Sequence, residues 1–153
     1  MLKETTLDKL EDSIIRSFEL DYDMVDFYDP NIADISRSEI PKDILRKLKE
    51  YNDVPSMKLK CFDFVLEDKF CGYVVICEER KLIVSFGLRV RDTKTKESFF
   101  SHIKKLMNDD FLCIFYKRNE RGLKWLTKMG MTIEFEQEHD GHPLVVLKYK
   151  FTL

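Results

Sequence analysis

Two apolar segments on either side of one amphipathic helix constrain the fold of this chain more than any other feature. Residues 82–90, LIVSFGLRV, have the β-branched pattern of a strand, and residues 111–116, FLCIFY, are apolar throughout. Between them lies a helix whose apolar residues share one stripe: Phe99, Phe100, Ile103, Leu106 and Met107. Strand, helix and strand in this order predict two parallel neighbouring strands joined by a right-handed crossover. Residues 111–116 are expected to be buried on both faces.

The remaining strands are predicted to be antiparallel. Residues 59–67 and 70–77 alternate or are rich in β-formers, and short polar turns join them to each other and to 82–90, which indicates a meander. Residues 131–137 and 143–151 form two more strands, joined around Asp140-Gly141. A further short strand is predicted over residues 1–4.

Helices are predicted in three other places. Apolar residues recur at helical spacing over residues 7–18, and Pro41 is suited to the first turn of a second helix. The third covers residues 120–129, with Asn119 as its N-cap and Gly130 at its end. The polar residues 91–97 are expected to form a turn before the crossover helix.

Length and composition favour one globular domain over residues 1–153. The chain has 153 residues, of which 44% are hydrophobic and 35% charged. Its first residues, MLKETTLDKLEDS, are too charged for a signal peptide, and no apolar run is long enough to span a membrane. The expected location is therefore the cytoplasm or the interior of a particle. The four cysteines lie in or beside apolar runs, which favours buried reduced thiols.

Charge is distributed unevenly along the chain. Residues 1–56 contain 14 acidic and 8 basic residues, whereas residues 89–128 contain 11 basic and 5 acidic ones. Two interpretations stay open: solvated faces of opposite sign, or a phosphate-bearing ligand or acidic partner for the basic region. Nucleic acid is not the favoured partner, because no aromatic-basic recognition motif accompanies the basic residues.

Two smaller features have alternative interpretations. The segment EHDGH at 138–142 is either a hairpin turn, a loop beside a substrate, or a metal site with two histidines, and the turn is favoured because Asp-Gly suits a two-residue hairpin. Trp125 is either a core residue or an anchor for a partner protein. Neither feature adds a metal ligand or a catalytic residue to the prediction.

The element order resembles that of the GNAT N-acetyltransferase superfamily over nearly the whole chain. Its most specific part is the stretch FLCIFYKRNERGLKWLTKMGM, in which a buried strand ends near Asn119 and the next helix closes at Met129-Gly130-Met131. The resemblance implies an α/β fold with a mixed, mostly antiparallel sheet, a central parallel strand pair and about four helices. The WLTKMGM variant is also similar to GNAT-like proteins encoded by tailed bacteriophages.

The resemblance further implies a place for acyl-CoA. In the family the cofactor lies where the two parallel strands splay apart, and its pyrophosphate sits at the N-terminus of the crossover helix. The family's R/Q-x-x-G-x-G/A loop aligns with residues 91–96, so Arg91, Lys94 and Lys96 are candidates to hold the phosphates. Asn119 is the candidate contact to the pantetheine region, with acetyl-CoA as the possible cofactor.

Three positions depart from the family's pattern. Lys94 and Lys96 stand where the loop has glycines, and their side chains hinder a close backbone approach to phosphate. Leu126 stands four residues before Gly130, where many members have a tyrosine that protonates the leaving thiolate. No catalytic residue is therefore assigned. The sequence favours a non-catalytic binding or structural role, with phage capsid or tail proteins as partners and the virion or host cytoplasm as location. The alternative is an active acetyl-CoA-dependent N-acetyltransferase.

Overall fold

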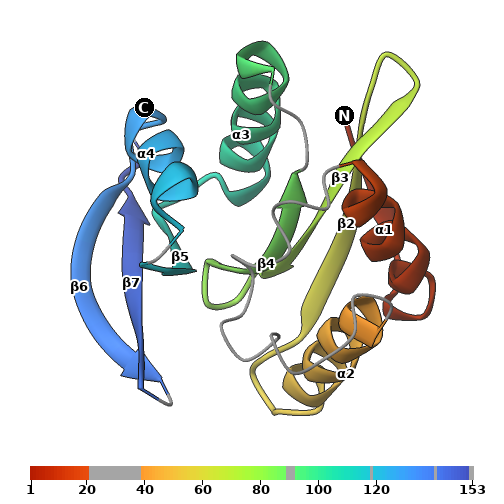
Figure 1. Cartoon of the computed structure of the whole chain (residues 1–153), viewed down its shortest axis with the longest axis horizontal. Helices are drawn as coiled ribbons and strands as arrows, with labels where there is room; N and C mark the ends of the chain where they lie inside the picture. The colour runs from red at the N-terminus through yellow and green to blue at the C-terminus, as the bar shows by residue number, and fades with distance from the viewer. Residues whose placement is uncertain (21–38, 89–91, 118, 140, 152–153) are drawn as a thin grey trace.

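A seven-stranded sheet forms the centre of the protein. The computed structural model describes residues 1–20, 39–88, 92–117, 119–139 and 141–151 (Figure 1). In this part of the chain the strands follow the order β1-β2-β3-β4-β5-β7-β6. Their bounds are β1 Leu2–Thr5, β2 Leu59–Leu66, β3 Lys69–Cys77, β4 Leu82–Leu88, β5 Phe111–Tyr116, β6 Thr132–His139 and β7 His142–Tyr149. Only β4 and β5 are parallel neighbours among them. The expected mixed, mostly antiparallel α/β sheet is confirmed.

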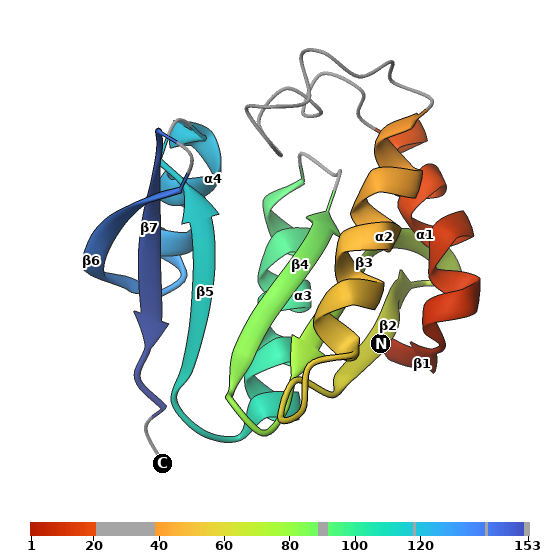
Figure 2. The same cartoon turned by 90° about the horizontal axis from the view of Figure 1, so that it is seen from below.

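Four described helices cover the two faces of the sheet. They are α1 Leu7–Leu20, α2 Ile40–Asn52, α3 Thr93–Met107 and α4 Glu120–Lys128. Figure 2 shows α1 and α2 together beside β2, β3 and β4, while α3 lies across the sheet from them. Within the described ranges, none of the helices combines the length and the apolar character that crossing a membrane requires.

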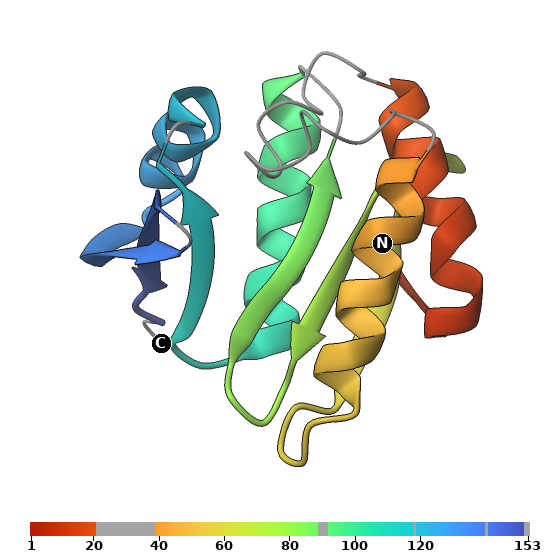
Figure 3. The ribbon, with the colours of Figure 1, turned by 60° about the horizontal axis from the view of Figure 1, so that its bottom comes forward.

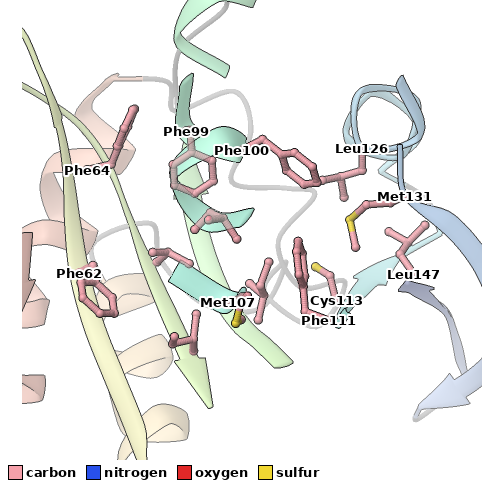
Figure 4. Close-up of a cluster of buried hydrophobic side chains, with 14 of the residues drawn as sticks. Phe62, Phe64, Phe99, Phe100, Met107, Phe111, Cys113, Leu126, Met131 and Leu147 are labelled. Carbon is pink, nitrogen blue, oxygen red and sulfur yellow. The ribbon is translucent and has the colours of Figure 1, made fainter. Parts of the chain in front are cut away.

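The alternation of side chains along β3 creates a hydrophobic core on each face. Tyr73 and Val75 belong to the first core, which they share with apolar residues of α1 and α2. Val74 and Ile76 point the other way and belong to the second core, with residues of α3, β5, α4 and β7 (Figure 4). All four cysteines are buried free thiols, as expected.

The structure corrects two expectations about the crossover. The predicted turn over residues 91–97 is largely helical, because α3 begins at Thr93 and its first turn is capped by Asp92. The strand β5 is not buried on both faces, since Ile114 is 43% exposed. No described helix covers the face of β5 to which Ile114 points, so its apolar sequence does not reflect burial on two sides.

The strands β4 and β5 meet only at their beginnings. Their paired residues are Leu82 with Leu112 and Ile83 with Cys113. Another backbone hydrogen bond, 2.8 Å long, runs from the Leu112 N–H to the carbonyl of Lys81. Beyond these residues the two strands diverge toward their carboxyl ends, as Figure 3 shows. Open α/β sheets bind ligands at such divergent ends, so this is where a functional site is sought.

Candidate ligand site between the parallel strands and beside their helices

Aromatic rings bridge the diverging strands on the side that faces α3 and α4. The ring of Phe86, on β4, stacks on that of Phe115, on β5, with centroids 6.0 Å apart and an interplanar angle of 19°. Phe86 also lies 6.0 Å from the ring of Phe99 and 6.3 Å from that of Trp125. The rings of Phe86 and Phe115 therefore keep β4 and β5 in contact where their backbones are no longer hydrogen-bonded.

Gly122 allows the Phe115 ring to lie against the first turn of α4. A Cβ atom at position 122 would be 2.5 Å from Cζ and 2.6 Å from Cε1 of Phe115. It would also be 3.0 Å from Nδ2 of Asn119. Carbon atoms do not approach so closely, so any side chain at position 122 requires the ring to move.

Asn119 caps α4, as the sequence predicts. Its side-chain oxygen accepts a hydrogen bond of 3.0 Å from the Gly122 N–H, and the residue is 8% exposed. This oxygen satisfies one of the free donors at the start of the helix. The side chain is thus placed by a structural contact, and its suggested contact with pantetheine stays a prediction.

The N-terminus of α3 carries an anion of its own. The carboxylate of Asp92 accepts hydrogen bonds from the Thr95 hydroxyl and from the Thr95 backbone N–H, the latter 2.7 Å long. These two bonds, that of the hydroxyl first, hold the pKa of Asp92 below its usual range. A negative charge therefore stands where the family resemblance places the pyrophosphate, and it would repel a second anion there.

The structure separates the predicted phosphate-binding residues. Lys94 and Lys96 both belong to the first turn of α3, but only Lys96 lines the hollow between α3 and α4. Residues two positions apart on a helix are rotated by about 200°, so the side chains of Lys94 and Lys96 leave α3 on nearly opposite sides. Arg91 lies outside the described residues, and Asn119 is not among the residues of the hollow.

Leu126 is a core residue. Its side chain is 2% exposed and belongs to the second core, where Figure 4 shows it near Phe100 and Met131. Its carbonyl accepts a hydrogen bond of 3.1 Å from the Met131 N–H, which closes the end of α4 together with Gly130 at φ +103°. This position provides packing and no proton donor.

A hollow of about 520 Å³ lies between α3 and α4. Its lining residues are Thr93, Lys96, Glu97, Phe100, Lys104, Arg121, Lys124, Trp125, Lys128 and Met129. Of these residues, the sequence singled out only Lys96 as a cofactor contact, and it left Trp125 open as either a core residue or a partner anchor. The missed signal is the helical spacing of basic residues on both sides of Phe100 in α3 and of Trp125 in α4.

Comparison with known proteins identifies the fold. No family model and no curated protein matches the chain by sequence. A GNAT-family acetyltransferase from Streptococcus agalactiae 2603 is similar in structure, with a TM-score of 0.70, 11% identity and coverage of 100% of this chain and 96% of that one. An aminoglycoside 6'-acetyltransferase type Ii has a TM-score of 0.64, 10% identity and coverage of 98% and 96%.

A third structure was determined with ligands. This is AAC(6')-Ib in complex with ribostamycin and coenzyme A, with a TM-score of 0.63, 11% identity and coverage of 98% of this chain and 92% of that one. Identities this low establish a shared fold and leave activity open. The chain has the fold of GNAT acetyltransferases.

Proposed function

We propose that this GNAT-fold chain is a non-catalytic binding or structural protein whose acyl-CoA gap is closed. The observation that carries the proposal is the stacking of Phe86 on Phe115 between β4 and β5. An acyl-CoA that passed between these strands would have to displace both rings from the second core. Their contacts with Phe99, Trp125 and Gly122 oppose that displacement.

Two further features support a loss of catalysis. Acyl transfer needs an anion site for the cofactor and a group that protonates the departing thiolate. The Asp92 carboxylate already binds the start of α3, and Leu126 offers no proton. Each feature removes one requirement of the reaction, and they arise from independent positions in the sequence.

The proposal extends to a bacteriophage origin and a place in the virion, with capsid or tail proteins as partners. It rests on the similarity of WLTKMGM to phage GNAT-like proteins, and it gives the host cytoplasm or the virion as location. Mass spectrometry of purified particles and host lysate tests it. Enrichment in particles is expected, and exclusion from them would remove the virion role.

The second candidate is an active acetyl-CoA-dependent N-acetyltransferase. The fold and the lysines of the hollow favour it, because cationic side chains beside the crossover helix attract phosphate groups. Arg91, Lys94 and Lys96 would then hold phosphates and Asn119 would contact pantetheine. Acetyl transfer would also require Phe86 and Phe115 to separate.

Thermal unfolding with and without millimolar acetyl-CoA distinguishes the two candidates. A ligand at about 100 times its Kd stabilises the native state by about 2.7 kcal/mol, which raises Tm by roughly 5–10 °C in a chain of this size. We expect no such shift. A shift that Lys96→Ala reduces and that the distant Lys9→Ala leaves intact would instead support the enzyme.

A further inference from the structure

The hollow between α3 and α4 has the same residue pattern on both of its walls. Along α3, Lys96, Phe100 and Lys104 are spaced by four residues, and along α4 Arg121, Trp125 and Lys128 are spaced by four and three. These spacings place each set on one helical face. Each wall therefore presents a cation, an aromatic ring and a second cation along the hollow.

The positive charge of these walls is poorly compensated. Glu97 is the one acid among the lining residues, which include Lys96, Lys104, Lys124 and Lys128. Within the described part of the chain, none of these four lysines forms a salt bridge. Lys104 instead lies 5.6 Å from the centroids of the Phe100 and Tyr149 rings. Such a concentration of unpaired cations attracts an anionic partner.

The rings of the hollow are poor platforms for nucleic-acid bases. Phe100 is 3% exposed, and its ring contacts those of Phe111 and Trp125, at 6.0 and 6.5 Å. Binding of single strands relies on exposed aromatic faces on which bases stack. An anion in this hollow is therefore recognised by the positive charges along its rim. The carboxylates of a protein segment can bind these charges without inserting a flat ring.

We propose that the α3–α4 hollow binds an acidic segment of a partner protein. This inference rests on the proposed non-catalytic function and names the chemistry of the partner. Lys124 and Lys128 are about 6 Å apart along α4, and Lys96 and Lys104 are about 12 Å apart along α3. Carboxylates four and eight residues apart on an acidic helix have these same spacings, so one such helix can pair with both walls.

The buried indole N–H of Trp125 also favours a bound oxygen atom at this site. Its indole Nε1–H is buried and has no hydrogen-bond acceptor among the described residues. Buried donors are normally paired, and Trp125 lines the hollow. A carboxylate or carbonyl oxygen of the bound segment satisfies this donor when the indole turns toward the hollow.

Fluorescence anisotropy with a labelled oligoglutamate peptide at low salt tests the proposal. The test variant is the double substitution Lys96→Glu with Lys124→Glu. The control, Lys9→Glu with Lys42→Glu, makes the same charge change at exposed positions on α1 and α2. We expect the test variant to weaken binding by about tenfold or more, the control to change Kd by less than about twofold, and added salt to weaken the binding of the unmodified chain.

Several outcomes would overturn the inference. They are an absence of peptide binding, equal losses in the two variants, or stronger competition by tripolyphosphate or a single-stranded oligonucleotide than by unlabelled peptide. Circular dichroism and Tm of both variants show that they fold. The acetyl-CoA experiment has a separate outcome: a rise in Tm with the cofactor would contradict the closed acyl-CoA gap, whereas peptide binding at Lys96 and Lys124 would stand.

Discussion

The ring of Phe86 on β4 lies 6.0 Å from the ring of Phe115 on β5, at a point where the two strands share no paired residues. The backbone separation typical of a ligand gap is therefore filled by the chain's own side chains. Both rings are partly buried and pack against the second core. This arrangement links the stability of the protein to the absence of a ligand between the strands.

Substitution of either stacked ring should reveal this link. Phe115→Ala removes a partly buried ring, and we expect it to lower the free energy of unfolding by roughly 2–4 kcal/mol. In a double-mutant cycle with Phe86→Ala, the coupling between the rings should be about 0.5–1.5 kcal/mol. Urea denaturation of the four proteins measures it. Additive losses, within about 0.5 kcal/mol, would mean that the stack does not connect the strands.

Gly122→Ala should be destabilising although alanine favours helices. The gain in helix propensity is about 1 kcal/mol, but the new Cβ would overlap the Phe115 ring. Overpacking of this kind costs about 1–3 kcal/mol, so we expect a net loss. In a Phe115→Ala background the overlap disappears and the same substitution should stabilise α4. The sign change, followed by urea denaturation, is the decisive observation, and a stabilising Gly122→Ala in the unmodified chain would contradict the close contact.

Removal of the Asp92 carboxylate should weaken α3 in a pH-dependent manner. Hydrogen bonds from Thr95 lower the pKa of Asp92 in the folded state, so its contribution is fully present above the unfolded pKa of about 3.9 and is lost as the pH falls through the folded value. Asp92→Ala should therefore lower Tm at pH 7 and have little effect in strong acid. Asp92→Ser keeps an uncharged cap and should recover part of the loss. A difference in Tm that is constant across this pH range would argue against a charged cap.

The buried thiols should be inert in the native protein. Burial raises the pKa of Cys113 to about 12 and, with nearby carboxylates, that of Cys61 to about 11. Because the thiolate is the reactive form, neither residue should react with a disulfide reagent at pH 8 until the chain unfolds. Titration with and without urea should show slow native labelling and fast labelling of all four cysteines after unfolding. Fast labelling of native Cys113 would show that β5 is less protected than its packing indicates.

Much of the fold could be predicted because local patterns decide it. The alternation over residues 59–67 and the β-formers of residues 70–77 correctly predicted strands, and Asn119 and Gly130 marked the two ends of α4. The strand-helix-strand order over residues 82–116 correctly predicted the parallel pair. In each case the signal lies within a few residues and does not depend on distant contacts.

The candidate site was harder to predict because it depends on pairs distant in sequence. Phe86 and Phe115 each belong to an apolar run, and their stacking follows only from how β4 and β5 diverge. The role of Gly122 is invisible without the ring that it accommodates. Asp92 was included in a predicted turn over residues 91–97, because its role as the cap of α3 depends on hydrogen bonds that its carboxylate accepts from Thr95.

The short contact between β4 and β5 has a mechanical consequence. Two residue pairs join these strands, whereas eight join β2 to β3. The sheet therefore consists of two parts, β1-β2-β3-β4 and β5-β7-β6, that are joined by a short β4–β5 contact. A force applied between Lys3 in β1 and Lys148 in β7 would act across the β4–β5 contact, where few backbone hydrogen bonds resist it. Under tension the two parts of the sheet should separate first at the pairing of Leu82 with Leu112. The stacked rings of Phe86 and Phe115 should be the last contact to break.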